Sequence, residues 1–233
     1  MVRLAMKAML LAAGLGTRLR PLTLETPKPL LPVGGKPMLV WHIERLVAAG
    51  VREMVINVSW LGDQIEYALG DGAAFGANIR YSREPGAPLD TGGGIRRALP
   101  LLGEAPFVVV SGDIWCDFPL GTLLADPLPR EVLARLVVVP NPPQHPEGDF
   151  RLQSDARLDR GVASGMPCTY SGIGMLSPRL LEGWDAEVFA LRDPFRAAAA
   201  QGALHGLCWE GDWEDVGTPE RYAALNRRLG SPG

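Results

Sequence analysis

Two arginines and an isolated lysine follow a glycine turn near the start of the chain. The turn contains Gly14 and Gly16, and the cations are Arg18, Arg20 and Lys28. Glycines let backbone N–H groups approach a ligand closely, and the cations supply positive charge for an anion. A phosphate group is the anion that this combination fits best. The sequence therefore predicts a phosphate-binding loop directly after the first apolar run.

This loop matches neither of the two common phosphate-binding motifs. A Walker A loop requires Gly, four other residues and then Gly-Lys-Ser/Thr, and that spacing fails after Gly14. A dinucleotide-binding loop requires Gly-x-Gly-x-x-Gly, but Leu19 occupies the third glycine position. A nicotinamide-dependent oxidoreductase is therefore disfavoured. A glycine-rich surface turn with solvated arginines is the non-functional alternative.

Two acidic residues far apart in the chain are expected to reach the same place as the loop. Asp113 follows an apolar run predicted as a strand, and Asp215 precedes a helix predicted from about Thr218. In an open α/β sheet, ligands bind beyond the carboxyl ends of the strands, where Gly14 also lies. Two carboxylates beside phosphate oxygens suit Mg²⁺, which takes few protein ligands. The alternatives are a turn residue at Asp113 and a helix N-terminal acid at Asp215.

These motifs resemble the sugar-1-phosphate nucleotidylyltransferases. The resemblance is carried by Gly-x-Gly-Thr-Arg-Leu-Arg-Pro-Leu-Thr from Gly14 and by Pro-Lys-Pro-Leu from Pro27, and it extends from Met6 to about Leu229. Four further segments are most similar to the branch of the family that joins UTP to N-acetylmuramate 1-phosphate in peptidoglycan recycling. These segments are 89–94, 109–115, 148–150 and 213–218.

The resemblance implies Mg²⁺-dependent nucleotidyl transfer, in which a sugar-1-phosphate oxygen attacks the α-phosphorus of a nucleoside triphosphate and pyrophosphate leaves. The attacking phosphate is already ionised, so the reaction needs no general base. Two other substrate pairings stay open, namely mannose 1-phosphate with GTP and glucose 1-phosphate with dTTP or UTP. A non-catalytic module that binds sugar nucleotides with the same fold is a further alternative.

The resemblance also implies a role for individual residues. Arg18 would hold the β and γ phosphates, Lys28 would neutralise charge at the α-phosphate, and Asp113 and Asp215 would bind Mg²⁺. The catalytic residues implied in this way are Arg18, Lys28 and Asp113. The implied nucleotide-binding residues are Ala12, Ala13, Gly14, Gly16, Thr17, Lys28, Glu84, Leu89 and Gly92. The implied sugar-phosphate-binding residues are Asp149, Gly172 and Trp213.

The sugar end of the site departs from the family pattern. Many relatives hold the sugar phosphate with a glutamate-lysine pair, but this chain has no lysine after Lys36. Asp159 and Arg160 are a possible replacement, and an exposed hairpin end is the alternative for them. The motifs at this end of the site therefore do not determine which sugar binds.

Composition limits the class of protein. A chain of 233 residues can bury a sizeable core, and its net charge of −3 gives no broad basic surface for nucleic acid. No apolar run is long enough to span a membrane, so no membrane partner is expected. Three widely spaced cysteines, Cys116, Cys168 and Cys208, indicate no disulfide framework and favour the cytoplasm. Small-molecule substrates and a monomer or homodimer are expected.

Apolar runs and helical periodicities alternate in the first half of the chain and predict an α/β fold. We expect a Rossmann-like, doubly wound mixed sheet of the nucleotide-diphospho-sugar transferase type with a sugar-binding cap. One domain should span 6–229, with a nucleotide-binding half at 1–125 and a sugar-binding half with a closing helix at 126–229. Strands are predicted at 8–13, 53–58, 78–81, 106–111, 133–139, 169–176 and 204–209, with a hairpin at 149–158. Helices are predicted at 38–49, 61–69, 91–99, 194–201 and 219–229.

Overall fold

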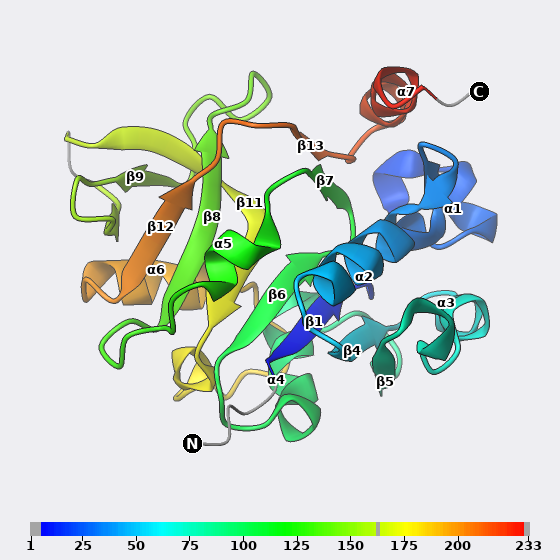
Figure 1. Ribbon diagram of the computed structural model, residues 1–233, viewed down its shortest axis with the longest axis horizontal. Coiled ribbons are helices and arrows are strands. Elements are labelled where there is room, and N and C mark those ends of the chain that lie inside the picture. The colour runs from blue at the N-terminus through cyan, green and yellow to red at the C-terminus, as the bar shows by residue number, and fades with distance from the viewer. Residues whose placement is uncertain (1–5, 162–163, 231–233) are drawn as a thin grey trace.

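A central β-sheet with helices on both faces runs through the chain (Figure 1). The computed structural model describes residues 6–161 and 164–230. Residues 1–5, which belong to the predicted nucleotide-binding half, lie outside the described residues.

Four parallel strands form one half of the sheet. β1 (Lys7–Leu11) lies between β4 (Glu53–Val58) and β6 (Phe107–Ser111) and is parallel to both. β5 (Asn78–Arg83) pairs in parallel with β4. β1 ends at Leu11, two residues before the predicted end, so Ala12 and Ala13 already belong to the loop that follows. The parallel order places the carboxyl ends of these strands at one edge of the sheet.

Antiparallel strands extend the sheet on the other side of β6. β11 (Met166–Leu176) pairs antiparallel with β6 and also with β8 (Ala134–Pro140), and β12 (Leu204–Cys208) runs parallel to β8. β9 (Phe150–Leu152) and β10 (Leu158–Asp159) form the hairpin predicted at 149–158, and β9 pairs with β11. The sheet is therefore mixed, as predicted.

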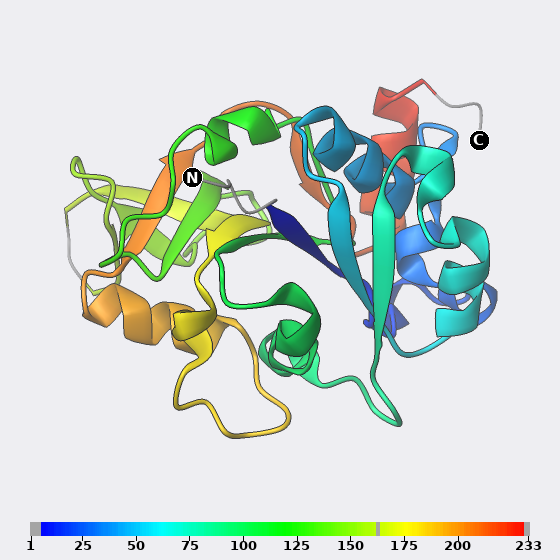
Figure 2. The same cartoon turned by 60° about the horizontal axis from the view of Figure 1, so that its bottom comes forward.

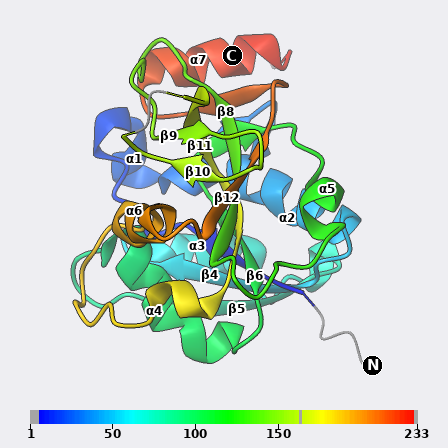
Figure 3. The same cartoon turned by 90° about the vertical axis from the view of Figure 1, so that its left-hand side faces the viewer.

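Helices cover both faces of the sheet because buried strand residues alternate between the two faces. In β1, Ala8 and Leu10 pack in one hydrophobic cluster and Met9 packs in another. The first cluster includes α2 (Met38–Ala48), α3 (Gly62–Leu69) and α5 (Leu120–Leu124), and the second includes α4 (Asp90–Leu102) and α6 (Arg192–Ala200). Figure 2 shows the sheet between these two layers, and Figure 3 shows α6 and α5 on opposite sides of β8 and β12.

The C-terminal segment returns to the parallel half of the molecule. β13 (Trp213–Asp215) pairs antiparallel with β7 (Ile114–Cys116), and α7 (Pro219–Arg228) follows. The hydroxyl of Thr218 accepts a hydrogen bond from the Arg221 N–H and caps the start of α7. Leu225 of α7 and Val216 pack with Leu19 of the predicted phosphate loop. The sequence did not predict β7 and β13, and this small sheet carries Asp215 toward the N-terminal loop.

Short elements connect the larger ones. They are η1 (Thr17–Leu19), α1 (Leu22–Glu25), η2 (Lys28–Leu30), β2 (Pro32–Val33), β3 (Lys36–Pro37), η3 (Ala73–Phe75) and η4 (Pro178–Leu181). None of the described helices is long and apolar enough to cross a membrane.

Candidate active site

The carboxyl ends of three parallel strands meet at Leu11. Its register partners are Asn57 in β4 and Ser111 in β6, so two polar side chains flank the start of the loop. The chain runs from β1 outward to β4 and β5 and then returns to β6 on the other side of β1, and ligand sites in α/β proteins gather where the strand order reverses in this way.

The loop after β1 leaves a row of backbone donors without protein partners. Among the described residues, no N–H group from Gly14 to Thr17 donates a hydrogen bond to the protein. A Cβ atom added at Gly14 would meet no atom within 4 Å, so this position is open. Gly16 differs, because its φ is +61° and an added Cβ would lie 2.8 Å from Thr23 Cγ2. The loop therefore presents free N–H groups on a backbone fixed by Gly16 and suits an anion.

The cations predicted beside the loop have different surroundings. Lys28 Nζ lies 2.7 Å from Asp113 Oδ2, and only 9% of the Lys28 side chain is exposed. Arg18 is exposed and lines two of the cavities described below. Arg20 is also exposed, but it lies outside the lining of those cavities. Lys28 and Arg18 are thus the loop cations that face the site.

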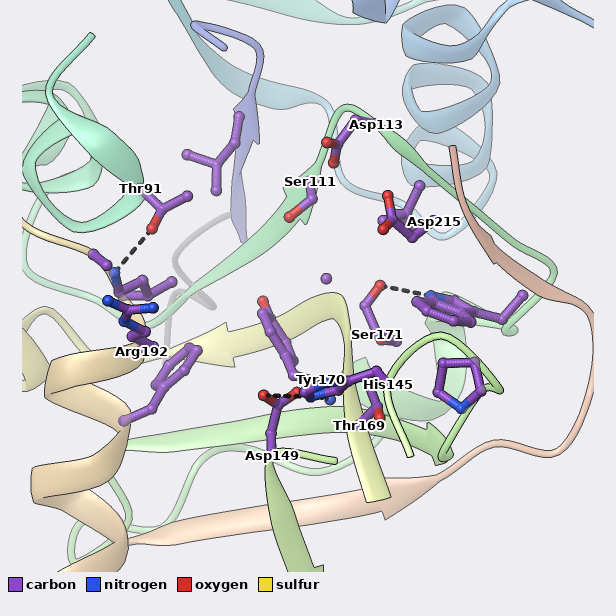
Figure 4. A pocket seen from close by; sticks show the side chains of 18 of the residues that line it. Thr91, Ser111, Asp113, His145, Asp149, Thr169, Tyr170, Ser171, Arg192 and Asp215 are labelled. Carbon is purple, nitrogen blue, oxygen red and sulfur yellow. Dashed lines mark hydrogen bonds and ion pairs between the residues drawn. The ribbon is translucent and has the colours of Figure 1, made fainter. Parts of the chain in front are cut away.

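Asp113 and Asp215 lie side by side although they are distant in sequence. Asp215 is the register partner of Ile114, and the Val216 N–H donates to the Asp113 carbonyl at 3.0 Å. Figure 4 shows both carboxyl groups facing the same cavity. Each acid has a cation of its own, since Arg221 Nη1 lies 3.1 Å from Asp215 Oδ2. The small β7–β13 sheet is the structural cause of this pairing.

The two carboxylates fit a magnesium ion that also binds phosphate. Among the described residues, no group of three or more histidine, cysteine, aspartate or glutamate side chains is arranged to hold a metal. Mg²⁺ is commonly held by one or two carboxylates, with water and substrate phosphates completing the octahedron. Asp113 and Asp215 supply this minimal oxygen set beside the free N–H groups of the loop.

Three cavities meet at Asp113. The α4 cavity, about 520 Å³, lies between the loop, Glu84 and the start of α4. The α6 cavity, about 410 Å³, lies between β11, Trp213 and the start of α6. The loop pocket, about 150 Å³, lies between Gly14, Arg18 and Gly217. Asp113 lines all three of them. The arrangement can hold two ligands that meet at this carboxylate.

Most predicted nucleotide-binding residues line the α4 cavity. They are Ala12, Ala13, Gly14, Gly16, Thr17, Lys28 and Glu84. Asn57, which the sequence analysis did not single out, also lines this cavity and links the loop after β1 to Glu84. Its Oδ1 accepts from the Ala12 N–H at 2.8 Å and its Nδ2 donates to Glu84 Oε1 at 2.7 Å. Glu84 Oε2 accepts from the Leu89 N–H at 2.8 Å. The signal for Asn57 was a polar residue in an otherwise apolar strand.

Leu89 and Gly92, the other two predicted nucleotide-binding residues, do not line any of these three cavities. Leu89 is buried, and it is linked to the site by the hydrogen bond that its N–H donates to Glu84 Oε2. A Cβ at Gly92 would lie 2.4 Å from Phe189 Cε2, so this glycine allows the segment before α6 to pack on α4. The Ala12 N–H is already bonded to Asn57 and is not free to donate to a ligand.

The three predicted sugar-phosphate residues all line the α6 cavity. Asp149 Oδ2 accepts from the Tyr170 N–H at 2.9 Å, and Asp149 Oδ1 lies 3.3 Å from His145 Nε2. Trp213 Nε1 donates to the Ser171 carbonyl at 2.8 Å, which fixes its ring at the wall. Gly172 has a φ of +91°, and an added Cβ would lie 3.0 Å from Ser111 Cβ. Glycine there lets β11 pass close to the end of β6.

Other residues of the α6 cavity were missed by the sequence analysis. Among them are Tyr170 in β11, and Arg192 and Arg196 in α6. Asp159 and Arg160, considered as a replacement for the missing lysine, do not line this cavity. Nothing in the local sequence pattern distinguished Arg192 and Arg196 from solvent-exposed arginines on a helix.

The fold and the site define a nucleotidyltransferase, and the chain belongs to the nucleotidyl transferase family, which matches residues 7–150. It is 50% identical over 216 residues to the N-acetylmuramate alpha-1-phosphate uridylyltransferase of Neisseria meningitidis serogroup B, covering 91% of this chain and 94% of that protein. It is 36% identical over 234 residues to the protein of the same name from Caulobacter vibrioides, covering 95% and 96% of the two chains.

Solved structures agree with this fold. The crystal structure of HddC from Yersinia pseudotuberculosis complexed with GMP-PN has a TM-score of 0.77 and 22% sequence identity, and the match covers 97% of this chain and 100% of that chain. The family match and the two relatives confirm the predicted family and type of enzyme, and the solved structure confirms the predicted fold class.

Proposed function

We propose that this nucleotidyltransferase transfers the uridylyl group of UTP to N-acetylmuramate 1-phosphate, giving UDP-N-acetylmuramate and pyrophosphate. The observation that carries the chemistry is the position of Asp113, beside Asp215 and at the junction of all three cavities. The choice of substrates is supported by the identity of 50% to the uridylyltransferase of Neisseria meningitidis serogroup B over most of both chains.

The two substrates occupy the two large cavities. UTP lies in the α4 cavity with its phosphates along the loop, where N–H groups from Gly14 to Thr17 and the Arg18 side chain face them. The sugar phosphate lies in the α6 cavity, with Asp149, Gly172 and Trp213 around the sugar. In this assignment residues 1–125 bind the nucleotide and 126–229 bind the sugar, with the C-terminal β13 completing the metal site.

The reaction is an in-line displacement at the α-phosphorus. A phosphate oxygen of the sugar 1-phosphate forms a bond to this phosphorus, and the bond to the oxygen that bridges the α and β phosphates breaks. Pyrophosphate leaves with that electron pair. Lys28 neutralises negative charge at the α-phosphate, and Arg18 with the loop N–H groups stabilises the pyrophosphate. Catalysis then consists of alignment and charge stabilisation.

Asp113 and Asp215 would hold Mg²⁺ in this site. When bound, the ion offsets the charge of the phosphate oxygens and keeps both substrates aligned. Lys28 and Arg221 position the two carboxyl groups from either side. We place the reaction in the cytoplasm and in peptidoglycan recycling, because it regenerates a UDP-activated cell-wall sugar.

A substrate panel tests the proposal. The purified chain is incubated with each of UTP, dTTP and GTP against the 1-phosphates of N-acetylmuramate, glucose and mannose, with and without Mg²⁺, and pyrophosphate release is measured. We expect the highest kcat/KM for UTP with N-acetylmuramate 1-phosphate, and no release without the metal. A higher kcat/KM for mannose 1-phosphate with GTP would replace the proposed substrates, and no release with any pair would favour a binding module.

The variant Asp113→Ala tests the metal assignment separately. We expect turnover to be abolished while the circular dichroism spectrum stays unchanged, because 42% of this side chain is exposed and it fills no core position. Wild-type activity in this variant would contradict the assignment.

A further inference from the structure

Two arginines of α6 face the α6 cavity without a close acidic partner. Arg192 is the first residue of α6 and Arg196 lies one turn later, so both side chains lie on one side of the helix. In the described part of the chain, Asp193 is the one acid within 4.0 Å of either guanidinium, and each distance is 3.8 Å. This distance is too long for a hydrogen bond. The two guanidinium groups are therefore available to a ligand.

Tyr170 adds an uncharged donor to the same wall. Its hydroxyl is buried and has no hydrogen-bond partner in the described part of the chain. Figure 4 shows this hydroxyl pointing into the cavity, on the side of Arg192. Burial and the nearby Asp149 raise the pKa of the Tyr170 hydroxyl, which therefore stays protonated and able to donate. A buried donor without an acceptor is costly in the free protein and suits a ligand oxygen.

This wall is separated from the groups that would handle the phosphates. Figure 4 shows Arg192 on one side of the cavity and Asp215 on the other, with Tyr170 between them. Lys28 does not line the α6 cavity, and it lies at Asp113, where the α-phosphorus must meet the sugar phosphate. An anion at Arg192 is therefore a second negative group of the sugar substrate.

Packing fixes the part of α6 from which the two arginines extend. The Leu191 N–H donates to Thr91 Oγ1 at 2.9 Å and so holds the start of α6 against the start of α4. Phe195, between the two arginines, packs edge-on against the Tyr170 ring with centroids 5.3 Å apart. The helix start and the Tyr170 ring are thus held in place before the substrate binds, which reduces the entropy lost on binding.

We infer that Arg192, Arg196 and Tyr170 form a subsite for a carboxylate carried by the sugar, separate from the site of its 1-phosphate. This inference rests on the proposed function and deepens it, because a hexose 1-phosphate without a carboxylate would leave these donors unpaired. Guanidinium groups match the two oxygens of a carboxylate in a fork geometry. The subsite therefore selects acidic sugars over neutral ones.

The test compares two sugars that differ by the acidic group. N-acetylglucosamine 1-phosphate is N-acetylmuramate 1-phosphate without its lactyl ether. We expect Arg192→Gln/Arg196→Gln to lower kcat/KM for N-acetylmuramate 1-phosphate by roughly 10- to 100-fold, mainly through KM. The same variant should change the inhibition constant of N-acetylglucosamine 1-phosphate less than about twofold. This inhibition constant requires no turnover of the neutral sugar.

Arg160→Gln is the matched control, because it removes an arginine that does not line the cavity, and it should leave both values unchanged. An equal loss for both sugars, or no loss for either, would overturn the subsite while leaving the proposed function intact. A wild-type chain that fails to use N-acetylmuramate 1-phosphate would instead remove the proposed function. Circular dichroism verifies that the exposed substitutions leave the fold unchanged.

Discussion

Gly14 and Gly16 lie two residues apart, but the loop needs glycine at each for a different reason. Gly16 holds a left-handed conformation against Thr23 and Lys28, whereas Gly14 faces open space. We expect Gly14→Ala to leave the melting temperature unchanged and to raise KM for UTP, because a methyl group blocks close approach of the phosphates. Gly16→Ala should cost about 1–3 kcal/mol of stability. Thermal denaturation and steady-state kinetics on both variants measure the difference, and a large loss of stability in Gly14→Ala would contradict it.

Asn57 hydrogen-bonds two buried groups, the Ala12 N–H and Glu84 Oε1. Removing its amide in Asn57→Ala leaves the Ala12 N–H and the Glu84 carboxylate each short of one hydrogen bond. We expect a loss of about 2–4 kcal/mol, since an unsatisfied buried polar group costs about 1–3 kcal/mol. Urea denaturation measures it. Asn78→Ala, at an exposed position of neighbouring β5, is the control and should change stability by less than about 0.5 kcal/mol. Equal losses in the two variants would contradict this role.

At the scale of elements, α2 and β7 enclose a histidine. His42 lies in α2 and is 5% exposed, and its Nε2 has no partner in the described part of the chain. Burial, together with the nearby Arg45, lowers the pKa of His42 from 6.5 to about 4. The unfolded chain therefore binds a proton at this residue between pH 6.5 and about 4, while the folded chain does not. Above pH 6.5 the titration of His42 therefore does not change the free energy of unfolding, and as the pH falls from 6.5 toward about 4 it lowers this free energy.

This linkage predicts a pH-dependent stability. Between pH 7 and pH 5 the wild type should lose about 2 kcal/mol through His42, and His42→Gln should lose that much less. His205, whose pKa is also lowered by burial, contributes in the same direction in both proteins and cancels in the difference. Urea denaturation at the two pH values measures this difference. Parallel stability profiles for wild type and variant would show that His42 does not titrate in this window.

The sequence predicts an element well when the element is long and has a clear hydrophobic pattern. The buried strands and amphipathic helices were found within a few residues, because their burial dictates which positions are apolar. β13 was missed because three residues, two of them acidic, carry no periodic signal. Its pairing with β7 depends on the route of the whole chain. For the same reason the sequence placed Asp113 and Asp215 near one site but could not find Arg192, whose importance comes from the cavity it faces.

At the scale of the whole molecule, the proposed metal site depends on the chain returning to its first half. The β6–β7 turn supplies Asp113, and the C-terminal β13 supplies Asp215 after the chain has passed through the antiparallel half (Figure 1). The contact of Leu225 and Val216 with Leu19 joins this return to the phosphate loop. The N-terminal loop, the β6–β7 turn and the C-terminal β13 therefore assemble the proposed metal and phosphate site together.

The contribution of the returning strand can be measured by magnesium titration. We expect Asp215→Asn to raise the Mg²⁺ concentration for half-maximal activity at least about tenfold, because one of the two proposed carboxylate ligands loses its charge. Asp212→Asn is the matched control: this acid is three residues earlier and pairs with Arg228 at 2.8 Å, and it does not line the α6 cavity. It should leave the Mg²⁺ requirement unchanged. An equal shift in both variants would mean that charge near the site, rather than coordination by Asp215, sets the requirement for the ion.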